Sequence, residues 1–202
     1  MVDFPSQPMA PAAFLESWYP EAFAAADTPA GADALDLRLG IHLAGEGGGE
    51  WVFHIAQGKL AVLPGSREES AFTFVQSVED WQGALWSGSG GAIGKGAATL
   101  FRPGAAAATA AAAGPQLAGA PSLEALAELE QLQGLLRMVV TEGPGADWAV
   151  GFKLGPGAIP ETATTTVSIT TADAQALETG ELDQMQAIQM QVAARAAQDE
   201  SS

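Results

Sequence analysis

Two stretches of alternating apolar and polar residues, each interrupted by a glycine-rich acidic loop, constrain the fold of this chain most. The first alternation covers residues 37–43, is interrupted by the loop GEGGGE, and resumes over residues 51–55. The second covers residues 136–140, is interrupted by EGPGAD, and resumes over residues 148–154. Alternation with a period of two on both sides of a short loop predicts a β-hairpin with one apolar face. The sequence therefore predicts two hairpins, each of which returns from its loop on a tryptophan.

The two hairpin patterns flank a low-complexity segment, PGAAAATAAAAGPQLAGAP, which begins at Pro103 and ends at Pro121. Alanine favours helix, but so short an alanine run is unstable as an isolated helix. We expect a linker over residues 104–121, with a packed alanine helix as the alternative. Alignment of Trp51 with Trp148 and of Gly58 with Gly155 predicts an internal duplication. The predicted units are residues 1–103 and 122–202, of which the second is possibly incomplete.

Each predicted hairpin is followed by a third strand and a helix start. The third strands are expected over residues 72–75 and 165–169. The pair Ser77 and Asp80 is typical of a capping box, and Thr170 or Thr171 is placed to cap the equivalent helix. Further helices are predicted from the apolar spacing over residues 14–23, 123–136 and 182–192. This order predicts an α+β fold with a mainly antiparallel sheet covered by helices.

Composition and charge exclude several classes of partner and site. Alanine and glycine provide 66 of the 202 residues, and the formal net charge is −16. So acidic a chain is not expected to bind nucleic acid or an anionic membrane through a basic patch. The chain has no cysteine, which excludes disulfides and thiolate metal sites. No apolar run is long enough for a membrane span, and no secretory signal is expected, so we expect a cytoplasmic protein.

The second half carries the residues of a family resemblance. Its elements are Asp147-Trp148, a glycine-bearing turn over residues 155–157, and the passage VSITTADAQALETGELD. The first half has a looser version, FTFVQSVEDWQGALWSG, followed by Gly94-Lys95-Gly96 in place of a Gly-Lys turn before a last strand. This order resembles the sterol carrier protein 2 (SCP2-like) family. The resemblance implies helices over a sheet, with an apolar tunnel that binds and transfers sterols or fatty acyl chains without catalysis.

The pattern of large apolar residues supplies the candidate ligand site. Tryptophans beside many small residues can line an apolar cavity. The predicted ligand-binding residues are Trp51, Phe53, Phe72, Phe74, Trp81, Leu85, Trp86, Trp148, Phe152, Leu177, Met185 and Ile188. The segment 182–192 is the predicted lid over this pocket. The alternative is a structural or protein-interaction module with a filled interior, and a homodimer or a protein partner is possible in either case.

Catalytic and metal-binding motifs are weak in this chain. His42 and His54 would be cross-strand neighbours in a hairpin centred near Gly48, which provides at most half of a metal site. The sequence around Ser87-Gly88-Ser89 follows a predicted helix rather than a strand, as a helix stop does and a nucleophile elbow does not. Lys95 is followed by Gly96 and Ala97, without the serine or threonine of a phosphate loop. We therefore expect no enzyme activity, no metal and no cofactor.

Overall fold

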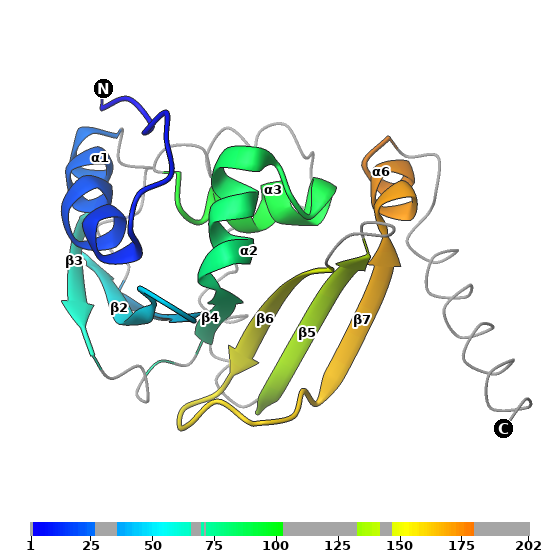
Figure 1. The fold of residues 1–202 in the computed structure, drawn as a ribbon. Helices are drawn as coiled ribbons and strands as arrows, with labels where there is room; N and C mark the ends of the chain where they lie inside the picture. Colours follow the sequence, from blue (N-terminus) through cyan, green and yellow to red (C-terminus); the bar gives the residue numbers. More distant parts are fainter. Residues whose placement is uncertain are drawn as a thin grey trace, which may run out of the picture.

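The computed structural model describes residues 2–26, 36–65, 70, 72–102, 133–141 and 147–179. These residues form an α+β fold in which one mixed sheet contains seven strands (Figure 1). The strands are β1 (Asp36–Ala44), β2 (Gly49–Ala56), β3 (Lys59–Pro64), β4 (Phe72–Ser77), β5 (Gly134–Thr141), β6 (Trp148–Leu154) and β7 (Thr165–Thr170). The helical elements are η1 (Ala13–Trp18), α1 (Tyr19–Ala25), α2 (Val78–Gln82), η3 (Gly83–Ser87), α3 (Gly91–Thr99) and α6 (Thr171–Thr179). No helix among these residues is long and apolar enough to cross a membrane.

Both predicted hairpins are confirmed, but the prediction of a mainly antiparallel sheet is wrong. Strand β1 pairs antiparallel with β2, and β5 with β6. The third strand of each half, however, lies beside the first strand of its hairpin and runs parallel to it, β4 beside β1 and β7 beside β5. In the second half β6 ends where β5 begins, and the Thr164 hydroxyl there accepts a hydrogen bond from the Leu135 amide at 3.1 Å. The short connection therefore brings β7 in at the same end as β5, which makes the pair parallel.

The two halves share one strand arrangement and one sheet. The sheet order is β3-β2-β1-β4-β6-β5-β7, so the run β2-β1-β4 of the first half is matched by β6-β5-β7 of the second. Strand β4 pairs antiparallel with β6 and joins the halves. The third strand of each half leads directly into a helix, α2 or α6. Strand β3 extends the sheet at one edge, and β7 forms the other edge.

The starts of α2 and α6 confirm the predicted caps. The Ser77 hydroxyl accepts a hydrogen bond from the Asp80 amide at 3.0 Å and donates one to the Asp80 carboxylate at 2.9 Å. The Thr170 hydroxyl accepts one from the Asp173 amide at 3.1 Å and donates one to the Asp173 carboxylate at 2.7 Å. Each hydroxyl satisfies a backbone donor that the first helical turn leaves without an intrahelical partner. The same Ser/Thr-to-Asp arrangement thus occurs once in each half.

We expect the first cap to stabilise the fold more than the second. The change Ser77→Ala should lower the free energy of unfolding by about 1 kcal/mol, because it removes the acceptor of the Asp80 amide in a partly buried position. Thr170→Ala should cost about 0.5 kcal/mol, because its hydrogen bonds are exposed. Urea unfolding of the two variants measures both values. Equal losses, or no loss for Ser77→Ala, would contradict the expected order.

Other predictions fall differently. Gly94-Lys95-Gly96 lies inside α3, so the turn before a last strand expected at these residues is wrong. Leu136, expected at the end of a helix, lies within β5. The linker 104–121, residues 123–132 of the leucine-rich segment and the lid 182–192 lie outside the described residues. Helices α1, α2 and α3 cover one face of the sheet, and the hydrophobic core lies between them and that face (Figure 1).

Candidate functional site

Nine of the twelve predicted ligand-binding residues have described side chains, and they lie together between the helices and the sheet. Six of them are buried in the hydrophobic core: Trp51, Phe53, Phe74, Trp81, Leu85 and Trp148. Three are half-buried: Phe72, Trp86 and Phe152. The side chain of Leu177 lies outside the described part of the structure, as do Met185 and Ile188. The nine residues come from both halves of the chain, and we call the layer that they form with their aromatic neighbours the aromatic layer.

The rings of the aromatic layer pack against one another. Phe53 stacks on Tyr19 with ring centroids 4.9 Å apart, and Phe74 meets Phe101 edge-on at 5.1 Å. Trp81 meets Phe101 edge-on at 5.8 Å. These separations lie in the range that aromatic pairs prefer. The six buried side chains are therefore closely packed parts of the core.

Sequence reasoning did not assign three residues of this layer to the site. Phe14 and Tyr19 lie in the predicted N-terminal amphipathic helix, whose apolar spacing could have assigned Phe14 to the layer. Phe101 is only 1% exposed, yet it borders the low-complexity segment and belongs to no periodic pattern. Its place follows from α3, which ends at Thr99 and directs the next residues into the core.

The aromatic layer reaches the surface at the join between the halves. Phe72 pairs directly with Leu154 across β4 and β6, and Phe152 pairs with Leu136 across β6 and β5. Directly opposed residues of antiparallel strands share one face of a sheet. All four side chains are half-buried, and the rings of Phe72 and Phe152 lie 5.6 Å apart. We call these four residues the apolar margin.

The two aligned tryptophans have polar partners but occupy different levels of their hairpins. Trp51 lies opposite Ile41 and donates a hydrogen bond from Nε1 to the Glu16 carboxylate at 2.7 Å. Trp148 lies opposite Val140 and donates to the backbone oxygen of Asp80 at 2.9 Å. Trp148 opens β6 directly after the hairpin loop, whereas Trp51 is the third residue of β2. The residue alignment therefore differs by two positions from the strand register.

The predicted pairing of the two histidines is wrong. His42 lies opposite Glu50, and His54 lies opposite Arg38, because the hairpin turns over residues 45–48 rather than about Gly48. Each histidine instead contacts an acidic side chain: His42 Nδ1 lies 3.5 Å from Glu50, and His54 Nε2 lies 2.8 Å from Asp36. Within the described ranges no three His, Asp or Glu residues group as metal ligands would.

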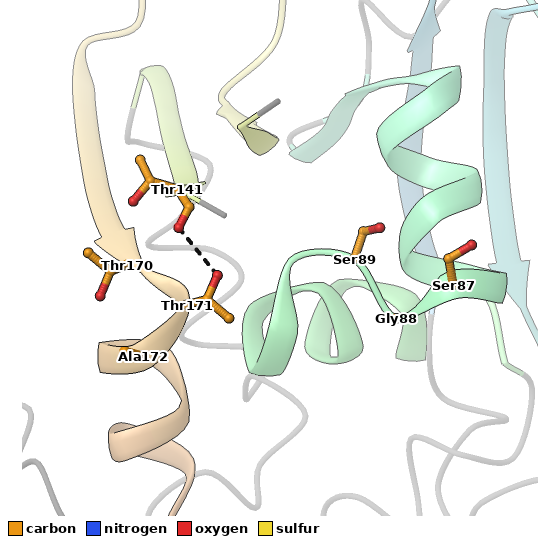
Figure 2. A pocket seen from close by; sticks show the side chains of 7 residues that line it. All are labelled: Ser87, Gly88, Ser89, Thr141, Thr170, Thr171 and Ala172. Carbon is orange, nitrogen blue, oxygen red and sulfur yellow. Dashed lines mark hydrogen bonds between the residues drawn. The ribbon is translucent and has the colours of Figure 1, made fainter. Parts of the chain in front are cut away.

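A polar hollow lies between the end of η3 and the second half of the chain (Figure 2). It measures about 760 Å³ and is lined by Ser87, Gly88, Ser89, Thr141, Thr170, Thr171 and Ala172. Gly88 has a φ of +72° and ends η3, which confirms the predicted helix stop. The hydroxyl of Thr171 donates to the backbone oxygen of Thr141 at 3.3 Å. None of the seven lining residues has a titratable side chain, so the lining offers hydrogen bonds but neither an acid nor a base.

Burial raises the pKa of two groups beside the aromatic layer. Asp80, in α2, has its carboxyl pKa raised by burial, against the opposing effect of its hydrogen bond from Ser77. Tyr19 has its phenol pKa raised by burial, and its hydroxyl donates to the backbone oxygen of Leu100 at 2.7 Å. Tyr19 therefore stays neutral and acts as a hydrogen-bond donor. Neither group lines the polar hollow.

The comparisons with known proteins leave the site to be interpreted from its own geometry. Family models, curated proteins and solved structures were each compared with this chain, and none matches it.

Proposed function

We propose that the chain binds a hydrophobic, lipid-like ligand, such as a sterol or a fatty acyl chain, without catalysing a reaction. The observation that carries this proposal is the gathering of the predicted pocket residues from both halves into one aromatic layer. We further propose that the two halves derive from one SCP2-like unit. The repeated strand order and the repeated caps of α2 and α6 support this second proposal.

The apolar margin is the proposed entrance. Its four side chains are half-buried and continuous with the core, because Phe152 contacts Phe74 with ring centroids 6.0 Å apart. A ligand that enters here would replace ring-to-ring contacts with ring-to-ligand contacts. The driving force would be the burial of apolar ligand surface, about 25 cal/mol per Å² before the entropic costs of binding.

A structural or protein-interaction module is the second candidate function. The close packing of the buried rings favours it, since Phe14 and Trp81 are 0% and 1% exposed with ring centroids 5.2 Å apart. In that case the aromatic layer serves only to hold the helices on the sheet. A protein partner or a second copy would then bind at a surface rather than inside.

Native mass spectrometry of the freshly purified chain, followed by titration of the delipidated chain with a fluorescent fatty acid, tests the proposal. We expect a bound mass of lipid size and a saturable fluorescence response. Leu154→Asp places a charge on the apolar margin and should weaken probe binding at least about tenfold, because a charge disfavours an apolar ligand. Leu63→Asp is the matched control, since Leu63 is 52% exposed on β3 and lies outside the margin.

The control should bind the probe as the unaltered chain does. If no lipid is found and no probe response occurs while the chain remains folded, the ligand proposal fails. A dimer detected by light scattering in the same samples would then favour the interaction module.

A further inference from the structure

Residues 2–10 lie across the helices as a segment without helix or strand (Figure 1). Three side chains of the helices donate hydrogen bonds to its backbone oxygens. Trp18 Nε1 donates to Asp3 at 3.1 Å, Trp86 Nε1 to Pro5 at 2.8 Å, and Gln82 Nε2 to Met9 at 3.0 Å. These donors come from η1, η3 and α2 and contact only main-chain atoms of the segment.

One side chain of the segment is anchored among rings. Phe4 lies 5.2 Å from Trp18, 5.6 Å from Trp86 and 6.0 Å from Phe14, measured between ring centroids. The guanidinium carbon of Arg102 lies 4.1 Å from the centre of the Phe4 ring, as in a cation–π contact. Arg102 is itself positioned by a hydrogen bond of 2.8 Å to the backbone oxygen of Leu85.

The segment has the properties of a peptide ligand. It contains Pro5 and Pro8, which lack backbone N–H groups and limit the hydrogen bonds that the segment can make with itself. Tryptophan N–H donors to backbone oxygens, combined with one anchored side chain, bind an extended peptide mainly through its main chain. Recognition of proline-bearing segments on aromatic surfaces follows the same physics. The selective contact is then the Phe4 ring, while the backbone contacts provide the orientation.

We propose that Trp18, Gln82, Trp86 and Arg102 form a peptide-binding site, which we call the Phe4 site. The proposed ligand is an extended segment of a partner protein with an aromatic residue followed by proline, as in Phe4-Pro5. Residues 2–10 occupy the site within the chain and act as an internal competitor. This proposal goes beyond lipid binding, because the Phe4 site is built from helices and includes no residue of the apolar margin.

Occupation within the same chain explains how such a site is regulated. A tethered segment has an effective concentration of about millimolar, so a free peptide of equal intrinsic affinity binds weakly while the segment is in place. Weakening the anchor should therefore open the site. Phe4→Ala removes the anchored ring and leaves all four site residues unchanged.

The test uses a fluorescently labelled peptide of residues 2–10, VDFPSQPMA, added to full-length chains and followed by fluorescence anisotropy. The Phe4→Ala chain should bind the peptide at least about tenfold more tightly than the unaltered chain. A peptide with alanine in place of its phenylalanine should bind the Phe4→Ala chain at least about tenfold more weakly. Adding Trp86→Phe, which keeps a ring but removes the donor to Pro5, should weaken binding by about two- to tenfold.

Phe23→Ala is the matched control, because Phe23 is another half-buried phenylalanine in the helical layer and has no contact with the segment. This chain should bind the peptide as weakly as the unaltered chain. The proposal is overturned if a folded Phe4→Ala chain, checked by circular dichroism, shows no saturable binding. It is also overturned if the alanine peptide binds equally well, or if Phe23→Ala enhances binding as Phe4→Ala does.

Light scattering over a range of concentrations distinguishes the remaining occupant. We expect the unaltered chain to be monomeric, with its own segment in place. A dimer that dissociates on Phe4→Ala would show that a second copy supplies the segment, and would overturn the assignment to a partner protein.

Discussion

Replacing Gly94 with alanine is expected to lower the free energy of unfolding by about 2 kcal/mol or more. A β-carbon at this position would collide with the backbone oxygen of Ser89, and it would also approach the ring of Trp148 at 3.7 Å. Ser89 cannot move freely, because its amide donates to the Gly83 oxygen at 3.1 Å and closes the end of η3. The backbone of α3 must therefore shift away from β6, which loosens the join between the two halves.

Gly96→Ala is the matched control within the same helix. Gly96 is exposed, and a β-carbon there would meet no atom within 4 Å. Alanine in a helix is more favourable than glycine by about 0.5–1 kcal/mol, so this variant should be stabilised by up to that amount. The same propensity gain is included in the expected loss for Gly94→Ala, which makes the collision the deciding effect.

Urea unfolding monitored by circular dichroism measures both variants. The prediction is specific in sign: one glycine in α3 should tolerate alanine with a gain, and the other should not. If both variants are stabilised, then α3 does not pack on Ser89 and Trp148 as closely as the structure describes. If both are destabilised, the helix itself requires glycine for another reason.

The parts of the fold that follow from local sequence could be predicted. Alternation over residues 37–43 and 148–154 predicts strands because side chains of a strand alternate between two faces. The caps at Ser77 and Thr170 could be predicted because the hydroxyl and the carboxylate lie only three residues apart. These features depend on neighbours in the sequence, so no knowledge of distant contacts is needed.

The features that depend on distant contacts could not be predicted. Alternation within β4 and β7 does not reveal which strand each will join, and both join the first strand of their hairpin in parallel. The turn expected at Gly94-Lys95-Gly96 rested on glycine being a poor helix former. Here the close approach of Trp148 and Ser89 leaves no room for a side chain at Gly94, and tertiary packing overrides propensity.

The candidate site shows the same limit. Large apolar residues of the hairpins could be assigned to one layer, since the apolar face of each strand was readable. Phe4 and Phe101 could not, because neither belongs to a periodic pattern and each is placed by contacts with residues far along the chain. The polar hollow was missed because its serines and threonines come from separate segments that only the fold brings together.

The other large effect concerns Trp148, the residue through which the second half reaches under the helices of the first. We expect Trp148→Ala to lower the free energy of unfolding by about 4 kcal/mol, as a buried tryptophan replaced by alanine leaves a cavity. Trp148 is only 2% exposed, and its ring fills the space above Gly90 and Gly94 of α3. Its loss also leaves the Asp80 oxygen of α2 without its donor. Such a loss is a large part of the 5–15 kcal/mol that is typical of folded domains.

Trp148→Phe separates the ring from the hydrogen bond. It keeps most of the buried ring and removes the donor to Asp80, so we expect a loss of about 1–2 kcal/mol. The same change at Trp18 should cost less, about 0.5 kcal/mol, because the hydrogen bond of Trp18 to Asp3 is exposed. Thermal and urea unfolding measure all three variants. A small effect of Trp148→Ala would mean that β4–β6 pairing alone holds the halves together. A large effect would show that α2, α3 and β6 unfold as one unit, since Trp148 is the side chain that contacts all three.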